Sequence, residues 1–205
     1  SPLLQGLMLS LGSRIWLPSM KHILDFAWQS HAKQTKGALS APYIYHPLAV
    51  CALVLKYGGS EAQAGGALLH DTISDEGASR EKYTELFGSE IARYAFAFAD
   101  PEIPNRATAN WIDSKKAYLA KVSTLKADEI LVIACEELHD LQEFVHDLKY
   151  KGGIAWDRHP VKRIDVFWYY RELLSIFNIH LRDEKPKLLV AEFATATSAL
   201  KQLVS

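Results

Sequence analysis

The chain has 205 residues, of which 49% are hydrophobic and 23% are charged, and its formal net charge is −1. This length and composition fit one folded domain and exclude a disordered chain. The balanced charge gives no reason to expect nucleic-acid binding, and no apolar run reaches the roughly 20 residues that a membrane-spanning helix requires. The two cysteines lie in apolar stretches, which favours free thiols and therefore a cytoplasmic location.

Almost every long segment places apolar residues at helical spacing, and no segment alternates as a strand does. We therefore predict an all-α fold, with a single domain over residues 1–205. Residues 1–19 would form an apolar N-terminal extension that packs on the domain or mediates self-association, which leaves a homo-oligomer open. Residues 178–205 would contain a C-terminal helix that packs on the domain. The predicted helices span residues 20–33, 47–55, 60–70, 79–87, 89–99, 113–121, 127–150, 160–177 and 187–203.

Glycine, proline and loop length divide these helices. Pro47 lies at a first helical position, where its missing N–H costs nothing, and Gly88 separates two helices. The longest loops are residues 36–42 and 100–110. Long loops in a compact domain often belong to a site, so we expect functional residues near them.

The most informative pattern joins a histidine to a later His-Asp pair. His46 lies at the start of one predicted helix, and His70-Asp71 lies at the end of the next. If these helices pack antiparallel, the start of the first lies beside the end of the second. Two imidazoles and a carboxylate are enough to begin a divalent-metal hydrolase site. The alternative interpretation is a set of capping or partly buried side chains.

Two further His-Asp pairs occupy one long predicted helix. His139-Asp140 and His146-Asp147 lie two turns apart, so they share roughly one face. A second metal there is conceivable, but an exposed polar stripe is the favoured interpretation. The aromatic residues 167–170 could stack on a purine base, although their spacing favours a place in the core.

The residues around these pairs form a series of motifs along most of the chain. The motifs are His31-x-x-Gln34-Thr35-Lys36, Pro42-Tyr43-Ile44-x-His46-Pro47-Leu48, Ala67-Leu68-Leu69-His70-Asp71-Thr72-Ile73-x-Asp75, Leu86-Phe87-Gly88-Ser89-Glu90-Ile91-Ala92, Trp111-x-x-x-Lys115-x-x-Tyr118-Leu119, Ala134-x-Glu136-x-Leu138-His139-Asp140 and Phe167-Trp168-Tyr169-Tyr170-Arg171-Glu172-Leu173. Together they resemble the HD superfamily, and within it the hydrolase domain of RelA/SpoT proteins and the stand-alone small alarmone hydrolases.

This resemblance implies an HD-type helical bundle with a His…His-Asp…Asp site that typically holds manganese. It also implies a small-molecule nucleotide substrate, (p)ppGpp, whose 3′-pyrophosphate is removed by a metal-activated water in the stringent response. Carried over to this sequence, three metal ligands are His46, His70 and Asp71. The fourth is Glu136, which stands where the family has aspartate and is one methylene longer.

The resemblance also implies catalytic residues after the His-Asp pair. The family's Glu-Asp couple, which handles the attacking water and the leaving group, falls on Ser74 and Asp75. Serine is not a general base near neutral pH, so proton transfer is predicted to fall on Asp75 or on its neighbour Glu76. If the helical turn continues, Asp75 faces the same way as Asp71. Ordinary capping and solvation of these carboxylates is the alternative.

The predicted substrate-binding residues are Gln34, Lys36, Lys115 and Asp140. The family's Arg-Lys pair falls on Lys36 and Gly37, so one of two cations is retained. Asp140 stands at the family's asparagine position. Lysines at these places could meet phosphates, and the alternative is that they are solvated surface residues.

The leading hypothesis is therefore a metal-dependent hydrolase of a nucleotide pyrophosphate. Two alternatives stay open. Ser74 and Glu136 depart from the family pattern, which favours a catalytically impaired HD protein that acts as a nucleotide-binding or regulatory module. The altered pair Lys36-Gly37 favours an HD phosphohydrolase with a different phosphorylated substrate.

Overall fold

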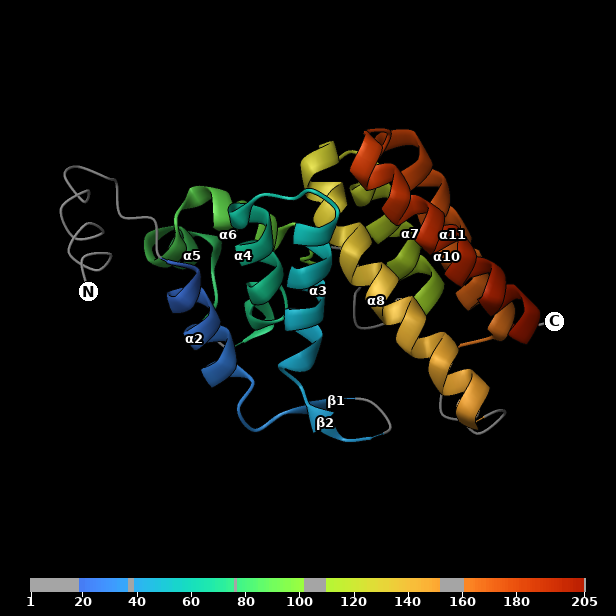
Figure 1. The fold of residues 1–205 in the computed structure, drawn as a ribbon, viewed down its shortest axis with the longest axis horizontal. Coiled ribbons are helices and arrows are strands. Elements are labelled where there is room, and N and C mark those ends of the chain that lie inside the picture. Colours follow the sequence, from blue (N-terminus) through green and yellow to red (C-terminus); the bar gives the residue numbers. More distant parts are fainter. Residues whose placement is uncertain (1–18, 37–38, 76, 102–109, 152–160, 205) are drawn as a thin grey trace, which may run out of the picture.

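The computed structural model describes residues 19–36, 39–75, 77–101, 110–151 and 161–204, and within them the chain is mostly helical (Figure 1). The all-α prediction is confirmed. Almost all of the predicted N-terminal extension lies outside the described residues. The helices are α2 (Met20–Ser30), α3 (Tyr45–Lys56), α4 (Glu61–Leu69), α5 (Arg80–Phe87), α6 (Ser89–Phe96), α7 (Trp111–Val122), α8 (Ala127–Lys151), α10 (Arg163–His180) and α11 (Glu184–Val204), with a 3-10 turn η1 (Thr72–Ser74) after α4.

A two-stranded hairpin is the one departure from helices among the described residues. Strands β1 (Thr35–Lys36) and β2 (Ala41–Pro42) pair antiparallel inside the predicted loop before α3. The sequence predicted no strand here, because two residues are too few to show alternation. The pairing of Lys36 with Ala41 fixes Lys36 close to the start of α3.

The helices form two packed groups that meet at α3, α4 and α8 (Figure 1). One buried cluster, with Ile23, Leu69 and Phe87, lies among α2, α4, α5 and α6. The other, with Ile133 and Phe193, lies among α7, α8, α10 and α11. Helix α4 contributes buried residues to both clusters and contacts α3, α6 and α8. The two groups of helices therefore meet at α4.

Local sequence fixes the start of α4 where it was predicted. The Ser60 backbone N–H donates to Gln63 Oε1 at 2.7 Å, and the Gln63 backbone N–H donates to Ser60 Oγ at 3.2 Å. This reciprocal capping box satisfies two backbone donors of the first turn. The Gln63 side-chain amide also donates to the Asp128 carbonyl oxygen at 2.7 Å, which ties the start of α4 to the start of α8.

The C-terminal helices differ from the prediction in their bounds. Helix α11 begins at Glu184 rather than at residue 187, because Pro186 lies in its first turn, where a missing N–H breaks no helical hydrogen bond. Helix α10 was predicted over residues 160–177 and spans Arg163–His180. Helix α11 packs along α8 and α10.

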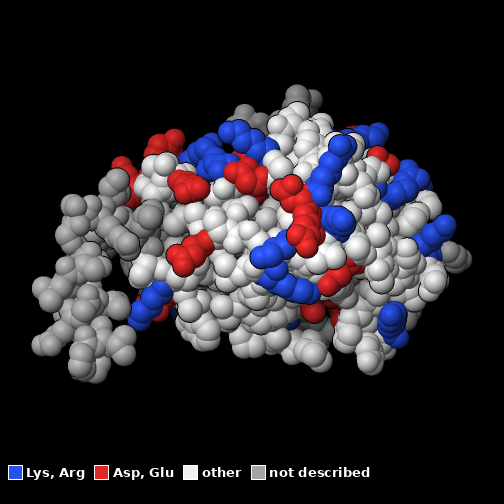
Figure 2. Space-filling view, turned by 45° about the horizontal axis from the view of Figure 1, so that its top comes forward, with Lys and Arg blue, Asp and Glu red and all other residues white. Residues whose placement is uncertain are grey.

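Two further expectations concern the distribution of surface charge and membrane-spanning helices. On the face drawn in Figure 2, basic and acidic side chains are interspersed, as the net charge of −1 leads one to expect. None of the described helices is long and apolar enough to cross a membrane.

Close packing between α4 and α6 generates the first prediction. A Cβ atom added at Gly66 would lie 3.0 Å from the Ala95 backbone nitrogen and 3.1 Å from the Tyr94 carbonyl carbon. Backbone atoms cannot yield without moving α6, so Gly66→Ala should lower the free energy of unfolding by about 1–3 kcal/mol. Urea unfolding of the metal-free protein measures this change.

The neighbouring glycine is a matched control. A Cβ atom at Gly65 would meet the Cδ1 methyl of Ile23 at 3.0 Å, and a side-chain end can rotate away. Because alanine also favours the helix by about 1 kcal/mol, Gly65→Ala should stay within about 1 kcal/mol of the wild type. Equal stability of the two variants would mean that α4 and α6 do not require glycine at their contact.

Candidate metal centre and adjoining cavity

Two buried histidines meet where α3, α4 and α8 come together. His46 lies in the first turn of α3, and His70 caps the C-terminal end of α4. Their Nε2 atoms are 3.2 Å apart. The prediction that the start of the first helix lies beside the end of the second is confirmed.

Asp71 lies against both imidazoles. Its Oδ2 atom is 3.1 Å from His70 Nε2 and 3.7 Å from His46 Nε2, and it accepts a hydrogen bond from the Tyr43 hydroxyl at 3.0 Å. Burial alone would raise the pKa of Asp71. The neighbouring imidazoles of His70 and His46, together with the Tyr43 hydroxyl, outweigh burial and hold that pKa well below its usual range. Asp71 is therefore an ionised carboxylate at neutral pH.

Glu136 reaches the same point from α8. Ligand atoms of His46, His70 and Glu136 all lie within 4.8 Å of one another. Burial raises the pKa of Glu136 well above its usual range, and the nearby charges of Glu137 and Asp140 raise it further. A divalent cation at this point would favour the ionised carboxylate instead. The mixed set of imidazole and carboxylate donors fits such an ion.

His46 is held neutral by its surroundings. Burial lowers the pKa of His46 to about 3, although the charge of Asp140 acts in the opposite direction. The charges of Lys36 and His70 lower it further. An unprotonated imidazole has a lone pair to offer, which is the state that metal ligation requires.

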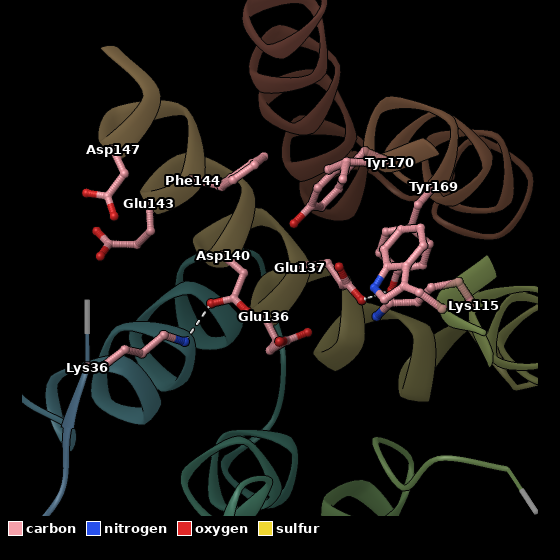
Figure 3. Close-up of a pocket in the computed structure, with 12 residues that line it drawn as sticks. Lys36, Lys115, Glu136, Glu137, Asp140, Glu143, Phe144, Asp147, Tyr169 and Tyr170 are labelled. Carbon is pink, nitrogen blue, oxygen red and sulfur yellow. Dashed lines mark hydrogen bonds and ion pairs between the residues drawn. The ribbon is translucent and has the colours of Figure 1, made fainter. Parts of the chain in front are cut away.

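A cavity of about 350 Å³ adjoins this centre (Figure 3). Its lining comes from β1, α7, α8 and α10 and includes five carboxylates and two lysines. Glu136 and Asp140 line the side next to the metal centre, and Lys36 Nζ lies 2.7 Å from Asp140 Oδ1. The metal centre and the cavity therefore share residues of α8.

The other end of the cavity is aromatic. The rings of Trp111 and Tyr169 lie 5.8 Å apart edge to face, and Lys115 Nζ lies 4.3 Å from the Tyr169 ring centroid. Figure 3 shows Lys115 and Tyr169 on the side opposite Lys36. The Tyr169 hydroxyl donates to the buried Glu137 carboxylate, whose pKa burial raises to about 7 against the charge of Lys115. Flat rings with polar groups at their edges can hold a nucleobase.

Three of the four predicted substrate-binding residues line the cavity, namely Lys36, Lys115 and Asp140. The fourth, Gln34, is exposed and does not line it. Its side-chain carbonyl accepts a hydrogen bond from His31 Nδ1 at 2.7 Å, so it fixes the chain between α2 and β1.

Asp75 would face the same way as Asp71 only if the helical turn continued past the His-Asp pair, and it does not. The α-helix ends at Leu69, η1 follows, and Asp75 is extended with φ −68° and ψ 149°. The i, i+4 relation to Asp71 therefore fails, because the chain leaves helical geometry between the two residues. Asp75 is exposed, and Glu76 lies outside the described residues.

Two residues of the centre escaped sequence reasoning. The first is Tyr43, whose hydroxyl donates to Asp71. Its place in the same motif as His46 was the one sequence feature that could have suggested this role. His139 was expected in an exposed polar stripe with His146. The prediction of an exposed polar side chain holds for His146, which is 58% exposed. It is wrong for His139, whose Nδ1 lies 2.9 Å from His46 Nδ1.

Comparisons of the sequence with known proteins agree with this arrangement. The sequence model of the HD domain matches residues 24–150. A "Probable guanosine-3′,5′-bis(diphosphate) 3′-pyrophosphohydrolase" of Synechocystis sp. is 42% identical over 67 residues, which are 33% of this chain and 9% of that protein. The "GTP pyrophosphokinase rsh" of Brucella ovis is 44% identical over 68 residues, again 33% of this chain and 9% of that protein. The matched region is thus a small part of these much longer relatives.

Two solved structures have a similar fold. A metazoan ortholog of SpoT that hydrolyzes ppGpp superposes with a TM-score of 0.64 and 17% identity, covering 89% of this chain and 97% of that one. A Listeria monocytogenes protein superposes with a TM-score of 0.62 and 20% identity, covering 78% of this chain and 98% of that one. At these identities the likeness concerns the fold alone.

The donor geometry predicts that a divalent ion stabilises the protein. Adding Mn²⁺ to about 100 times its dissociation constant should raise the free energy of unfolding by about 2.7 kcal/mol, since only the folded state holds the ligands together. His70→Ala should lose this gain, because it removes one of the converging nitrogens. Differential scanning calorimetry of EDTA-treated protein, with and without Mn²⁺, measures both effects. A folded His70→Ala protein that Mn²⁺ stabilises as much as the wild type would contradict the assignment of His70 as a metal ligand.

Proposed function

The chain belongs to the HD domain family, and on this premise we propose that it is a metal-dependent phosphohydrolase acting on a nucleotide 3′-pyrophosphate of the (p)ppGpp type. One observation carries the proposal. Ligand atoms of His46, His70 and Glu136 converge beside Asp71, at the edge of a cavity with lysine and aromatic side chains in its wall. The names of the longer relatives, which include a 3′-pyrophosphohydrolase, support the substrate class.

In this proposal His46, His70, Asp71 and Glu136 hold one divalent ion, with Mn²⁺ the ion that the resemblance implies. When bound, the ion lowers the pKa of a coordinated water and offsets charge on phosphoryl oxygens. The neutral His46 and the ionised Asp71 are already in the states that ligation requires. Tyr43 keeps the Asp71 carboxylate oriented through its hydrogen bond.

Proton transfer falls to the segment after η1. Asp75 is exposed and therefore accessible to a bound substrate, and Glu76 follows it in the chain. Ser74, at the end of η1, has no carboxylate to contribute. One carboxylate in place of a couple predicts slow turnover.

The two ends of the cavity suit the two ends of a nucleotide. Lys36 stands next to the metal-centre side, where it would meet a phosphate after giving up its contact with Asp140. Trp111 and Tyr169 offer flat surfaces for the base, with Lys115 beside them. The volume of about 350 Å³ lies within the range of ordinary ligand pockets.

A second candidate is a phosphohydrolase whose substrate carries fewer phosphates. Five carboxylates and two lysines line the described part of the cavity, and Lys36 is already paired with Asp140. Such a wall repels a highly phosphorylated nucleotide more strongly than a singly phosphorylated one.

A third candidate is a nucleotide-binding regulatory module without catalysis. Ser74, together with the extended and exposed Asp75, supports it, because neither residue is held against the metal centre by helical geometry. The metal site itself is common to all three candidates, so turnover is the property that separates them.

We also propose a cytoplasmic location and a role in alarmone turnover during the stringent response. The free thiols of Cys51 and Cys135 suit a reducing compartment, and nucleotide substrates are found there. The proposed partner is a small nucleotide rather than a nucleic acid.

The direct test is incubation of the purified protein with Mn²⁺ and ppGpp, with GDP and pyrophosphate separated by ion-exchange chromatography. Both products should appear in equal amounts. His70→Ala should lower the rate by more than about 100-fold, since even residues that support a ligand are worth 10–100-fold. His146→Ala is the control, because His146 is exposed on α8 and should retain the wild-type rate.

A panel of nucleotides with fewer phosphates separates the candidates. Faster release of phosphate from a singly phosphorylated nucleotide than from ppGpp would favour the second candidate. Binding of nucleotide without turnover of any substrate would favour the regulatory module.

Ser74→Glu tests whether the scaffold lacks only its second carboxylate. A positioned general base contributes about 10²–10⁴-fold, so this variant should raise kcat by about 100-fold. Ser74→Gln has nearly the same size without the charge and should leave kcat unchanged. Equal rates for the two variants would show that residue 74 does not take part in proton transfer.

A further inference from the structure

The ring of His139 faces the first turn of α3 from the middle of α8. Its centroid lies 4.9 Å from that of His46, and the two Nδ1 atoms are 2.9 Å apart. Two ring nitrogens at this distance share one hydrogen, so one donates and the other accepts. The donor of this hydrogen bond decides whether Nε2 of a neutral His46 carries a hydrogen or a lone pair.

The backbone fixes the tautomer of His70. His70 Nδ1 lies 2.6 Å from the Ala67 carbonyl oxygen, and a carbonyl only accepts, so Nδ1 carries the hydrogen. A neutral His70 then has its lone pair on Nε2. That nitrogen faces His46 Nε2 at 3.2 Å and Asp71 Oδ2 at 3.1 Å.

His46 has two neutral tautomers, and only one of them is a ligand at this point. With hydrogen on Nε2, His46 donates to His70 and its Nδ1 accepts from His139. With hydrogen on Nδ1, His46 donates to His139, and its Nε2 lone pair converges with that of His70. Two lone pairs 3.2 Å apart repel unless a cation lies between them. Metal ligation by Nε2 therefore requires His139 to accept.

A competing arrangement would place an ion on the other side of His46. Ligand atoms of His46, His139 and Asp140 also lie within 4.8 Å of one another. A neutral imidazole has one lone pair, so His46 cannot serve both ions. Asp140 Oδ1 is also 2.7 Å from the Lys36 ammonium, which already supplies a positive charge there. The geometry favours one ion, on the His70 side.

We propose that His139 is a positioning residue, which accepts the His46 Nδ1–H bond and thereby holds the His46 Nε2 lone pair on a single metal ion. The inference rests on the metal centre of the proposed function but not on its substrate. His139 acts through His46 and does not touch the ion itself.

The test compares three variants by isothermal titration calorimetry with Mn²⁺, at constant pH and with metal-free protein. His139→Leu removes the acceptor and should weaken Mn²⁺ binding by about 10–100-fold, the usual cost of losing a ligand's support. His139→Asn offers Oδ1 near the place of Nδ1 and should stay within about threefold of the wild type. His146→Leu, two turns further along α8, should bind as the wild type does. Each protein that binds should take up one ion per chain.

A spectroscopic measurement reports on the tautomer directly. Nitrogen-15 NMR of the histidine rings, with diamagnetic Zn²⁺ in place of Mn²⁺, should show hydrogen on His46 Nδ1 in the wild type and in His139→Asn. Circular dichroism establishes that each variant is folded, so a loss of binding by an unfolded protein is not counted.

Four results would overturn the inference, and the first three are a stoichiometry of two ions, a folded His139→Leu protein with wild-type affinity, and equal weakening of Mn²⁺ binding by His139→Leu and His139→Asn. Wild-type protein that takes up no divalent ion would overturn it as well. The expected order of Mn²⁺ affinities across the series, without nucleotide turnover by the wild type, would count against the proposed function alone. Turnover by the wild type, with an unchanged Mn²⁺ affinity in His139→Leu, would count against this inference alone.

Discussion

The burial of one imidazole between three helices is the constraint on which the site depends. His46 is 1% exposed, and its two nitrogens face opposite sides, Nε2 toward His70 at the end of α4 and Nδ1 toward His139 on α8. Buried polar atoms need partners, so both contacts must be kept and the separations of α3, α4 and α8 are thereby set. Gly66 allows α4 to approach α6 closely, which holds the end of α4 in place. The helices thus hold ligand atoms of His46, His70 and Glu136 within 4.8 Å of one another.

Helix α8 joins the metal centre to the rest of the cavity. Glu136 and Asp140, four residues apart, share the face toward α3, while Glu137 is turned by about 100° and meets Tyr169 of α10. The aromatic wall belongs to α7 and α10, and Glu137 of α8 contacts its Tyr169, so α8 helps to set the span from the metal centre to that wall. A ligand must match that span, so selectivity follows from length as well as from charge. The carboxylates that face inward make excess negative charge on the ligand costly.

The sequence could predict those features of the site that nearby residues in the chain report, and it could not predict contacts between distant helices. His46 and His70 were placed correctly because one lies at the start and the other at the end of a strongly apolar helix, and the Ser60 cap fixes where the second helix starts. The predicted helix ended at residue 70, and the relation of Asp75 to Asp71 depended on one further helical turn, which η1 and the extended Asp75 replace. Periodicity along α8 predicts that His139 and His146 share roughly one face, and it does not report which helix each of them meets. The contact of His139 with His46 of α3 is a tertiary contact, and residue spacing along α8 carries no information about it.

Metal binding and catalysis are physically separable in this chain. The ligands project from packed helices, so losing one disturbs buried neighbours and the fold resists the change. The residues proposed for proton transfer lie at the end of η1 and just after it, where Ser74 and Asp75 are exposed and Ser74 stands at the glutamate position of the family pattern. Such an exchange removes a proton-transfer group at almost no cost in stability. A set of converging metal ligands is therefore evidence for the fold and for ion binding, and it does not by itself imply fast chemistry.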